Sequence, residues 1–220
     1  MKIYKTIFFD LDGTLTDSSP GILSSVKYAL TEMGREIPDE AVLGEFLGPP
    51  LTDSFSKFCG MTEAEAKEAA TFYRSVYVQG ERCVTENSLY EGIPQTLERL
   101  KAAGKILAVA TTKPKVIAEK IVTHYGIREF FTDVCGSAPD GTGGEKAAVI
   151  KSALEICGET DLSQALMIGD RFYDIEGAKA VGIDSVGVLY GYGSRSELEK
   201  AGATYIVSTA AEVAELILGK

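Results

Sequence analysis

The sequence lacks the residues on which several classes of site depend. It has one histidine, and its four cysteines lie far apart and form no Cys-x-x-Cys pair: Cys59, Cys83, Cys135 and Cys157. This spacing excludes a metal-knuckle site and argues against a disulfide framework, so we interpret the cysteines as small buried hydrophobic residues in a reducing compartment. His124 comes just before Gly126. We expect it at the surface end of a helix, where it suits the helix dipole, and not as a ligand or base.

Positive charge and long apolar runs are also scarce. The chain has 22 lysines and arginines against 32 aspartates and glutamates, which gives a formal net charge of -10. Such a surface should repel nucleic acid and anionic membranes, and no apolar run approaches the roughly 20 residues of a membrane span. The N-terminal stretch MKIYKTIFFD contains no small-residue cleavage site. We therefore expect a cytoplasmic protein that binds neither nucleic acid nor membrane. We also expect a monomer or homodimer.

Short apolar runs alternate with helical patterns along most of the 220 residues, of which 45% are hydrophobic. Strands are expected at residues 3–9, 106–110, 132–135, 165–168, 185–189 and 205–207. Helices are expected between them, at residues 93–103, 115–125, 145–157, 173–181 and 195–201. The alternation predicts an α/β fold in which a parallel, Rossmann-like sheet is covered by helices on both faces.

Residues 18–86 interrupt this alternation, because they contain helical patterns and no convincing strand. Thr62 and Glu65 form the signature of a capping box that opens a helix reaching about Val78. We therefore predict two domains: an α/β core of residues 1–17 and 87–220, and a small all-helical cap of residues 18–86. An insertion directly after the first strand hangs over the carboxyl ends of the strands, where open α/β sheets bind ligands, and this favours a lid.

Polar residues stand at the carboxyl ends of four predicted core strands or in the segments that follow them: Asp10 and Asp12, Thr111 and Thr112, Lys146, and Asp170 and Asp174. These strand ends share one edge of a parallel sheet, so residues far apart in the sequence should converge on one crevice. Burying two neighbouring carboxylates is costly. The pair after the first strand therefore indicates a function that needs both.

The motifs DLDGTL and GDRFYD, a threonine after the second core strand and a downstream lysine resemble those of the haloacid-dehalogenase-like hydrolase superfamily. The helical insertion after the first motif is similar to the cap of its phosphoglycolate-phosphatase-like branch. The resemblance runs along essentially the whole chain. It implies a Mg2+-dependent phosphatase that hydrolyses a small phosphomonoester, phosphoglycolate-like or a nucleoside 5'-monophosphate, through an aspartyl-phosphate intermediate.

The catalytic residues follow from the same resemblance. It implies that Asp10 is the nucleophile and that Asp12 is the general acid for the leaving oxygen and then the general base for water. Lys146 should neutralise the growing charge on the phosphoryl group. The proline that usually follows this lysine in the family is absent here, and Lys113 and Lys115 are nearby alternatives for its role.

A metal is implied because an anionic nucleophile repels an anionic phosphate. Mg2+ relieves this repulsion, since it prefers carboxylate and phosphate oxygens. By resemblance, its ligands are Asp10, the main-chain carbonyl of Asp12, and Asp170, with Asp174 supporting the ligand shell.

The substrate is expected to contact both domains. By resemblance, Thr111 and backbone N–H groups near Leu11 and Thr112 hold the phosphoryl oxygens. In the cap, the segment EFLGPPL contains Gly48 and Pro49 in what should be a rigid turn, and we expect substrate contacts there.

Other activities fit parts of the sequence. A sugar-phosphate mutase of the same fold usually has a polar or basic residue at the position of Ile22. A phosphonate-cleaving relative would need a cap lysine, for which Lys27 and Lys57 stay open. A phospho-aspartate signalling module would store phosphate on Asp10, but it needs neither a lid nor an acid/base at Asp12.

Two glycine-rich segments fail the tests for nucleotide-binding loops. GTGGEK has Glu145 where the P-loop requires a glycine before its lysine, and Ala147 where it requires serine or threonine. GYGSRS, which begins at Gly191, has Ser196 in the last glycine position of the dinucleotide fingerprint. We therefore predict neither a P-loop nor a dinucleotide site.

Overall fold

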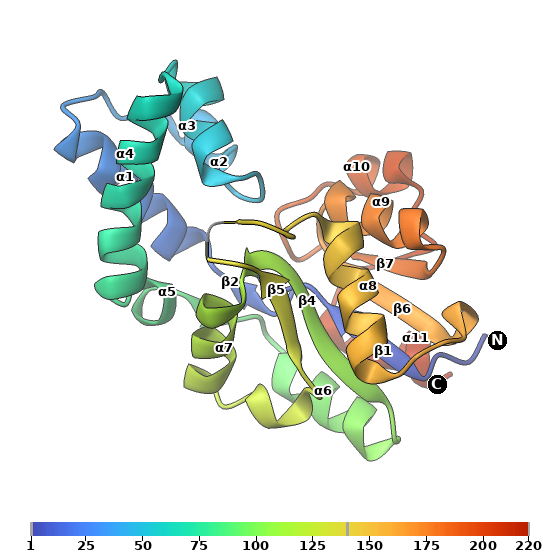
Figure 1. Cartoon of the computed structure of the whole chain (residues 1–220). Helices are drawn as coiled ribbons and strands as arrows, with labels where there is room; N and C mark the ends of the chain where they lie inside the picture. Colours follow the sequence, from blue (N-terminus) through green and yellow to red (C-terminus); the bar gives the residue numbers. More distant parts are fainter. Residues whose placement is uncertain (1, 140, 220) are drawn as a thin grey trace. The chain divides into compact units, whose positions relative to one another are not determined.

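The computed structural model describes residues 2–139 and 141–219, and the chain divides into two compact units (Figure 1). One unit consists of Met1–Asp17 and Leu89–Lys220, and the other of Ser18–Ser88. The connecting segments contain two short strands, β2 (Thr16–Asp17) and β3 (Ser88–Leu89), which form a two-stranded sheet. Every helix in the described residues falls short of the length and apolarity that a transmembrane span requires.

The first unit is built on six parallel strands in the order β5-β4-β1-β6-β7-β8. The strands are β1 (Thr6–Phe9), β4 (Ile106–Pro114), β5 (Val134–Ser137), β6 (Ala165–Gly169), β7 (Asp184–Val188) and β8 (Tyr205–Val207). In the centre of the sheet, Phe8 lies beside Ala108 on one side and Met167 on the other. Every residue of β1 is buried, as expected of a strand whose two faces are both covered.

Helices cover both faces of this sheet: α6 (Ile93–Ala102), α7 (Lys115–His124), α8 (Lys146–Cys157), α9 (Phe172–Val181), α10 (Arg195–Ala201) and α11 (Ala210–Leu218) (Figure 1). Two short 3-10 segments, η2 (Arg128–Phe130) and η3 (Leu162–Gln164), precede β5 and β6. Because parallel crossovers are right-handed, α6 and α7 lie on one face and α8, α9 and α10 on the other. α11 packs on α6, and the core beneath α8 includes Phe8, Met167 and Ile150.

The direction of the chain across the sheet reverses at β1. From β1 the chain moves outward through β4 to β5, and then it crosses back to β6 and continues to β7 and β8. The carboxyl end of a strand at such a reversal is where open α/β sheets bind their ligands. Asp10 follows β1 at this point.

The predicted α/β class, with its parallel sheet and helices on both faces, is confirmed, whereas several strand ends differ from the prediction. β1 begins at Thr6 and not at residue 3, because Ile3 is 75% exposed and lies outside the sheet. β4 runs on to Pro114, beyond the predicted end at residue 110. The extension consists mainly of polar residues, whose pattern gives no signal of a strand.

The second unit is helical, apart from its last residue. Its helices are α1 (Ser19–Glu32), α2 (Glu40–Gly44), α3 (Leu51–Cys59), α4 (Glu63–Arg74) and α5 (Arg82–Thr85), with a π-helical turn, η1 (Ser75–Gln79), directly after α4. The predicted capping box is present, since Thr62 and Glu65 exchange side-chain to backbone hydrogen bonds. The helix predicted to reach Val78 is therefore α4 continued by η1.

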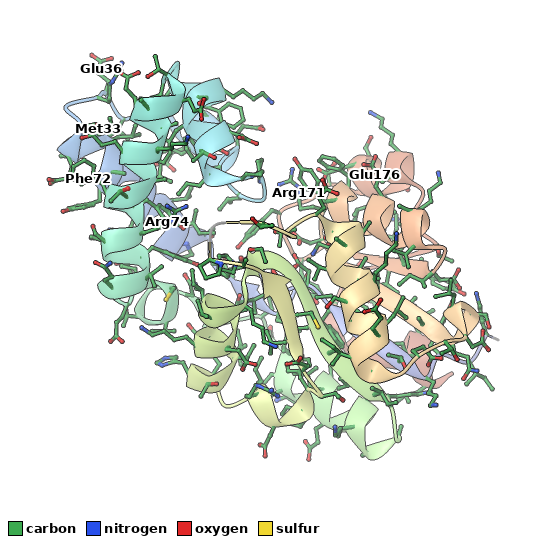
Figure 2. All side chains as sticks on the ribbon, in the orientation of Figure 1. Met33, Glu36, Phe72, Arg74, Arg171 and Glu176 are labelled. Atoms are coloured by element: carbon green, nitrogen blue, oxygen red, sulfur yellow. The ribbon has the colours of Figure 1, made fainter. Side chains whose placement is uncertain are left out.

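Helix α4 shows how the second unit forms a core of its own. The helix buries a stripe of small and aromatic side chains, Ala66, Ala69, Ala70 and Tyr73, and it packs against α1 and α3. Glu36 and Arg74 are exposed (Figure 2). The unit thus separates an apolar interior from a charged exterior, as a small globular domain does.

Side-chain contacts hold the two ends of the second unit together. The Oδ1 atom of Asn87 lies so close to Gly21 that a Cβ at Gly21 would stand 2.5 Å from it. Arg82 Nη1 donates a hydrogen bond to the Ser24 hydroxyl at 3.3 Å, and Arg82 Nε lies 3.3 Å from the Glu86 carboxylate. The start of α1 is therefore packed against the last residues of the same unit.

Ile7→Ala and Ile3→Ala should differ strongly in their effect on stability. Ile7 is fully buried in β1, so its truncation should lower the free energy of unfolding by about 2–5 kcal/mol. Ile3 is 75% exposed, so the same truncation should change it by less than about 0.5 kcal/mol. Denaturant unfolding of both variants measures the two effects. Equal losses would show that the strand begins at residue 3.

Candidate active site

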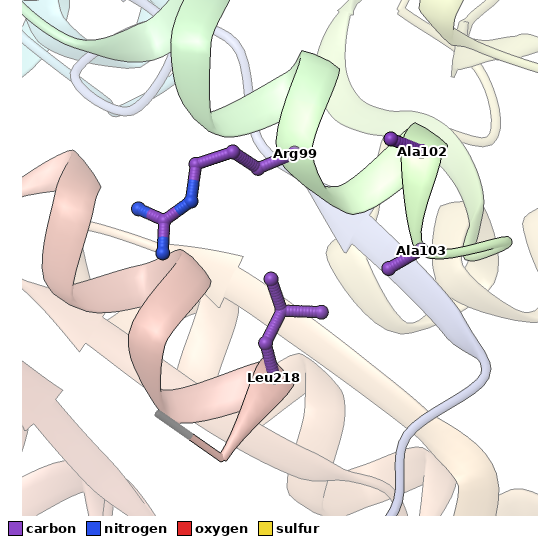
Figure 3. Close-up of a pocket in the computed structure, with 4 residues that line it drawn as sticks. All are labelled: Arg99, Ala102, Ala103 and Leu218. Carbon is purple, nitrogen blue, oxygen red and sulfur yellow. The ribbon is translucent and has the colours of Figure 1, made fainter.

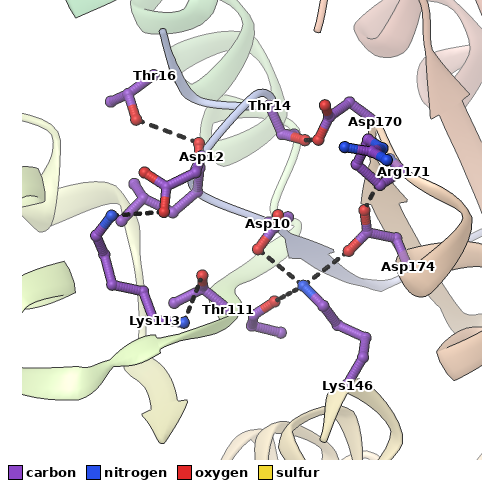
Figure 4. A network of polar contacts seen from close by, with 12 residues as sticks. Asp10, Asp12, Thr14, Thr16, Thr111, Lys113, Lys146, Asp170, Arg171 and Asp174 are labelled. Carbon is purple, nitrogen blue, oxygen red and sulfur yellow. Dashed lines mark hydrogen bonds and ion pairs between the residues drawn. The ribbon is translucent and has the colours of Figure 1, made fainter. Parts of the chain in front are cut away.

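Four charged side chains meet beyond the carboxyl ends of β1 and β6 (Figure 4). Asp10 directly follows β1, and Asp170 directly follows β6. Lys146 is the first residue of α8, and Asp174 lies in the first turn of α9. Lys146 Nζ lies 2.8 Å from Asp10 Oδ1 and 2.7 Å from Asp174 Oδ1, and it donates to the carbonyl oxygen of Ala110 at 3.0 Å. The lysine thus ties two carboxylates to the main chain of β4.

The other carboxylate of the cluster, Asp170, is fully buried. The Thr14 hydroxyl donates to its Oδ1 at 3.3 Å, and the N–H of Tyr192 donates to its Oδ2 at 2.8 Å. Besides its contact with Lys146, Asp174 caps α9, because its Oδ2 accepts a hydrogen bond from the N–H of Arg171 at 3.1 Å. Asp10, Asp170 and Asp174 each offer an oxygen within 4.8 Å of the other two.

Burial and mutual repulsion perturb the pKa values of the cluster. Burial raises the pKa of Asp10 to about 6; Lys146 opposes this shift, and Asp174 adds to it. Burial, followed by the charges of Asp174 and Asp10, raises the pKa of Asp170 well above its usual range. Burial alone would lower the pKa of Lys146, but Asp10 and Asp174 outweigh it and raise that pKa. Perturbed groups gathered at one place are typical of functional sites.

The cluster fits a divalent cation. Two of its three carboxylates, Asp10 and Asp174, pair with the ammonium group of Lys146, so ionisation of all three leaves negative charge that this lysine does not balance. Carboxylate oxygens are the donors that hard cations such as Mg2+ and Ca2+ prefer. The donor set and its excess charge therefore suit a divalent metal.

The turn after β1 explains the spacing of the DLDGT motif. The N–H of Gly13 donates to the carbonyl oxygen of Thr16 at 2.8 Å, and the N–H of Thr16 donates to that of Leu11 at 2.9 Å. Gly13 has φ +83°, and a Cβ there would overlap the Asp170 carboxylate. Glycine is required because the backbone adopts a left-handed conformation in close contact with that side chain.

Asp12 has a different neighbour from Asp10. Its Oδ2 accepts from Lys113 Nζ at 2.6 Å (Figure 4). The lysine reaches it from the polar extension of β4. In the same extension Thr111 is buried, and its hydroxyl oxygen accepts from the N–H of Lys113 at 3.3 Å. The acceptor role leaves the hydroxyl proton of Thr111 available for another partner.

The remaining predicted residues lie in different environments. Thr112 is exposed, and Leu11 is fully buried. Gly48 and Pro49 lie between α2 and α3 in the second unit. Lys115, an alternative to Lys146 in the prediction, pairs with Asp133 at 3.0 Å and lies outside the carboxylate cluster.

Sequence reasoning missed three contacts of this site. The sequence presents Lys113 only as an alternative to Lys146, whereas in the structure Lys113 pairs with Asp12. The contacts of Thr14 and Tyr192 with Asp170 were not predicted. The hydroxyl of Thr14 was visible in the first motif, but its partner depends on the fold. The N–H of Tyr192 has no sequence signal, since every residue except proline carries one.

A surface hollow lies elsewhere on the first unit, between α6 and α11 (Figure 3). The described residues that line it are Arg99, Ala102, Ala103 and Leu218. None of them belongs to the cluster around Asp10. The chemistry of the chain therefore points to the cluster and not to this hollow.

A doubly wound parallel sheet with perturbed carboxylates and a buried lysine at its point of reversal defines the chain as an α/β protein with an enzyme-like site. Residues 7–188 match the family described as haloacid dehalogenase-like hydrolase. The chain belongs to this family.

Similar proteins match nearly the whole chain. A 5'-nucleotidase of Pseudomonas aeruginosa is 40% identical over 215 residues, which are 97% of this chain and 96% of the relative. The tyrosine-protein kinase PtkA of Mycobacterium tuberculosis is 39% identical over 210 residues, 96% of this chain and 70% of the relative. A phosphoglycolate phosphatase of Colwellia psychrerythraea is 30% identical over 213 residues, 93% of each chain. The crystal structure of a predicted phosphatase from Clostridium acetobutylicum has a TM-score of 0.91 and 41% identity, and it covers 99% of this chain and 100% of its own.

These matches bear on the predictions made from the sequence. The predicted family is confirmed, and so is the predicted enzyme class, a phosphatase of the haloacid dehalogenase-like type. The substrate, the metal and the roles of individual residues stay predictions.

Mg2+ should raise the melting temperature of the chain more at about pH 7.5 than at about pH 5. A cation that binds only the folded state stabilises it, by about 2.7 kcal/mol at 100 times its dissociation constant. The pKa of Asp10 is raised to about 6 and that of Asp170 is raised as well, so protons displace the cation as the pH falls through this range. Thermal unfolding with and without Mg2+ measures the shift.

Two variants locate the cation in this experiment. Asp170→Asn should lose the Mg2+-dependent shift, because it removes one carboxylate of the cluster. Asp133→Asn should keep it, because Asp133 pairs with Lys115 outside the cluster. An equal shift in both variants would place the cation elsewhere.

Proposed function

We propose that the chain is a Mg2+-dependent phosphatase that hydrolyses a small phosphomonoester through an aspartyl-phosphate on Asp10. The observation that carries the proposal is the environment of Asp10. Its carboxylate stands at the reversal point of the sheet, 2.8 Å from the buried ammonium of Lys146 and beside two further carboxylates. A buried nucleophile held by a cation suits attack on an anionic phosphoryl group.

The reaction takes place in two steps. An Asp10 oxygen attacks phosphorus, and the bond from phosphorus to the ester oxygen breaks as Asp12 gives that oxygen a proton. Asp12 then takes a proton from water as that water attacks the phosphorus of the aspartyl-phosphate. The bond from phosphorus to the Asp10 oxygen breaks, which releases inorganic phosphate and regenerates the Asp10 carboxylate. The pairing of Asp12 with Lys113 supports the second step, because it fixes the position of the carboxylate that takes the proton from water.

Mg2+ would be held by Asp10, Asp170 and the main-chain carbonyl of Asp12, with Asp174 supporting the ligand shell. When bound, it supplies positive charge that offsets the repulsion between the carboxylates and the phosphoryl oxygens. Lys146 contributes further positive charge, because its ammonium group pairs with Asp10 and also with Asp174.

The phosphoryl oxygens would be bound by the Thr111 hydroxyl and by the N–H groups of Leu11 and Thr112. The contact of Thr111 with the N–H of Lys113 supports this role, because it orients the hydroxyl while leaving its proton free to donate. Such donors stabilise the charge that spreads over the phosphoryl oxygens in the transition state.

A nucleoside 5'-monophosphate is the substrate that we favour over phosphoglycolate. The relative named 5'-nucleotidase is 40% identical to this chain, whereas the relative named phosphoglycolate phosphatase is 30% identical. A sugar-phosphate mutase is less compatible with the structure. Its polar or basic residue would stand at Ile22, and that side chain is buried within the second unit.

Asp10→Asn should reduce the release of phosphate from a nucleoside 5'-monophosphate by about four orders of magnitude. An amide cannot form the acyl-phosphate, whereas its shape preserves the fold. Phosphate release in the presence of Mg2+ measures the rate, and circular dichroism checks the fold. Asp133→Asn is the matched control and should retain activity. A variant that keeps more than a few per cent of the wild-type rate, free of contaminating phosphatase, would remove Asp10 as the nucleophile.

We also propose that Ser18–Ser88 acts as a cap and that its segment Glu45–Leu51 contacts the substrate. The segment joins α2 to α3, its Gly48 is exposed with φ +116°, and Pro50 directly precedes α3. Pro49 and Pro50 each fix their own φ angle, so this part of the segment offers a rigid surface to a ligand. The residues around Asp10 would bind only the phosphoryl group, so selectivity among esters must come from another part of the chain.

Glu45→Gln and Pro49→Ala should change kcat/KM unequally among phosphate esters. Esters with large leaving groups should be affected most, and a minimal substrate such as acetyl phosphate should be nearly unaffected, because it has little for the cap to hold. A panel of substrates measures the pattern. Glu36→Gln, an exposed position in the same unit, is the matched control. A uniform fall across all substrates would assign the segment to folding or closure and not to selection.

A further inference from the structure

The loop that contains GYGSRS is the sequence motif left without a role. Residues 189–194 join β7 to α10, and Ser194 caps that helix. The loop fails the dinucleotide fingerprint, yet it places two glycines and two tyrosines beside the carboxylate cluster. The partners named below, which are Tyr90, Asp170 and residues 13–17, belong to the first unit, as the loop does.

The two glycines lie against Asp170. A Cβ on Gly191 would overlap the carbonyl oxygen of Gly13 and the side chain of Asp170. A Cβ on Gly193 would overlap the carbonyl oxygen of Asp170. The backbone of the loop therefore fills the space beside this carboxylate so closely that no larger residue fits without displacing it.

The hydrogen bonds of Asp170 fix its orientation. Tyr192 donates its N–H to Oδ2 at 2.8 Å, and the Thr14 hydroxyl donates to Oδ1 at 3.3 Å. Both donors are neutral groups, so they orient the carboxylate without cancelling its charge. A carboxylate held in this way is presented in one direction and keeps its affinity for a cation.

The tyrosine side chains anchor the loop to the first strand and its turn. The Tyr190 hydroxyl donates to the carbonyl oxygen of Thr14 at 3.0 Å, and its ring lies 5.0 Å from that of Tyr90. The Tyr192 hydroxyl lies 3.4 Å from Asp17 Oδ1. The loop thus connects the Asp170 carboxylate with the segment that follows Asp10 and Asp12.

We infer that residues 190–193 form a positioning loop for a divalent cation, acting through Asp170. The inference rests on the metal site of the proposed function. The loop acts on the cation through the side chain of Asp170. It sets the direction of one ligand oxygen through the N–H of Tyr192, the close packing of Gly191 and the anchor of Tyr190. Loosening it should therefore weaken metal affinity before it affects the chemical step.

The test measures binding of Mn2+ to the whole chain by electron paramagnetic resonance, with no substrate present. Gly191→Ala should weaken binding by about 10- to 100-fold, the range for groups that orient metal ligands. Tyr190→Phe removes one hydrogen bond and should weaken binding by about 2- to 10-fold. Gly44→Ala is the control, because Gly44 has open space around it and lies in the second unit. Circular dichroism with chelator checks that each variant is folded.

Each outcome bears on one of the two proposals. Weaker Mn2+ binding by folded Gly191→Ala, with wild-type binding by Gly44→Ala, supports the loop. Unchanged binding by folded Gly191→Ala overturns it, and if that variant does not fold, unchanged binding by Tyr190→Phe overturns it. A wild-type chain that binds no Mn2+ overturns the metal site as well as the loop. Loss of phosphatase activity in Asp10→Asn with normal Mn2+ binding by both loop variants leaves the proposed function standing and removes the loop alone.

Discussion

The ion pairs of Lys146 are the contacts on which the organisation of the cluster depends. Its ammonium group lies between Asp10 and Asp174, 2.8 Å from one and 2.7 Å from the other, and so offsets their mutual repulsion. Removing the partner of a buried charge costs about 3–5 kcal/mol, so burying either carboxylate in its ionised form would be costly without the lysine. Helix packing fixes the stem of Lys146, since a Cβ on Gly177 of α9 would stand 2.6 Å from its Cγ. The close approach of α8 and α9 is thus part of the same arrangement.

The parallel sheet supplies what the lysine cannot, which is the alignment of carboxylates from different strands. The register pairs Phe9 with Ile168, and the N–H of Asp10 donates to the carbonyl oxygen of Ile168 at 2.9 Å. Asp170 follows two residues after Ile168, directly beyond the end of the neighbouring strand. A slip of one residue between β1 and β6 would turn the side chains of one strand to the opposite face and separate the two carboxylates. The buried residues of both strands prevent such a slip.

The sequence predicted the parts of this site that depend on strand ends, and it could not predict the parts that depend on side-chain direction. Asp10 and Asp170 were expected together because parallel strands end at one edge. The contact of Lys113 with Asp12 requires β4 to run on to Pro114, and polar residues carry no signal for that extension. The glycine spacing of the loop at Gly191 predicts no dinucleotide site, and it carries no signal for the packing of the loop on Asp170. Under the proposed function, selectivity among esters rests on the second unit, whose helical sequence pattern predicts a fold and not a ligand.

The contacts between Gly21 and Asn87, and between Arg82 and Ser24, have a consequence for how the chain folds. Joining β1 to β4 through a long flexible segment costs loop-closure entropy, which grows by about 0.6 kcal/mol for each doubling of length. A second unit that folds on its own brings its two ends together before the sheet forms. The segment to be closed when β1 pairs with β4 is then short. The loop-closure entropy of that pairing is therefore almost independent of the length of the insertion. Folding of the six-stranded sheet should therefore follow folding of the helical unit. Destabilising the helical unit should slow formation of this sheet, although the unit contributes no strand to it.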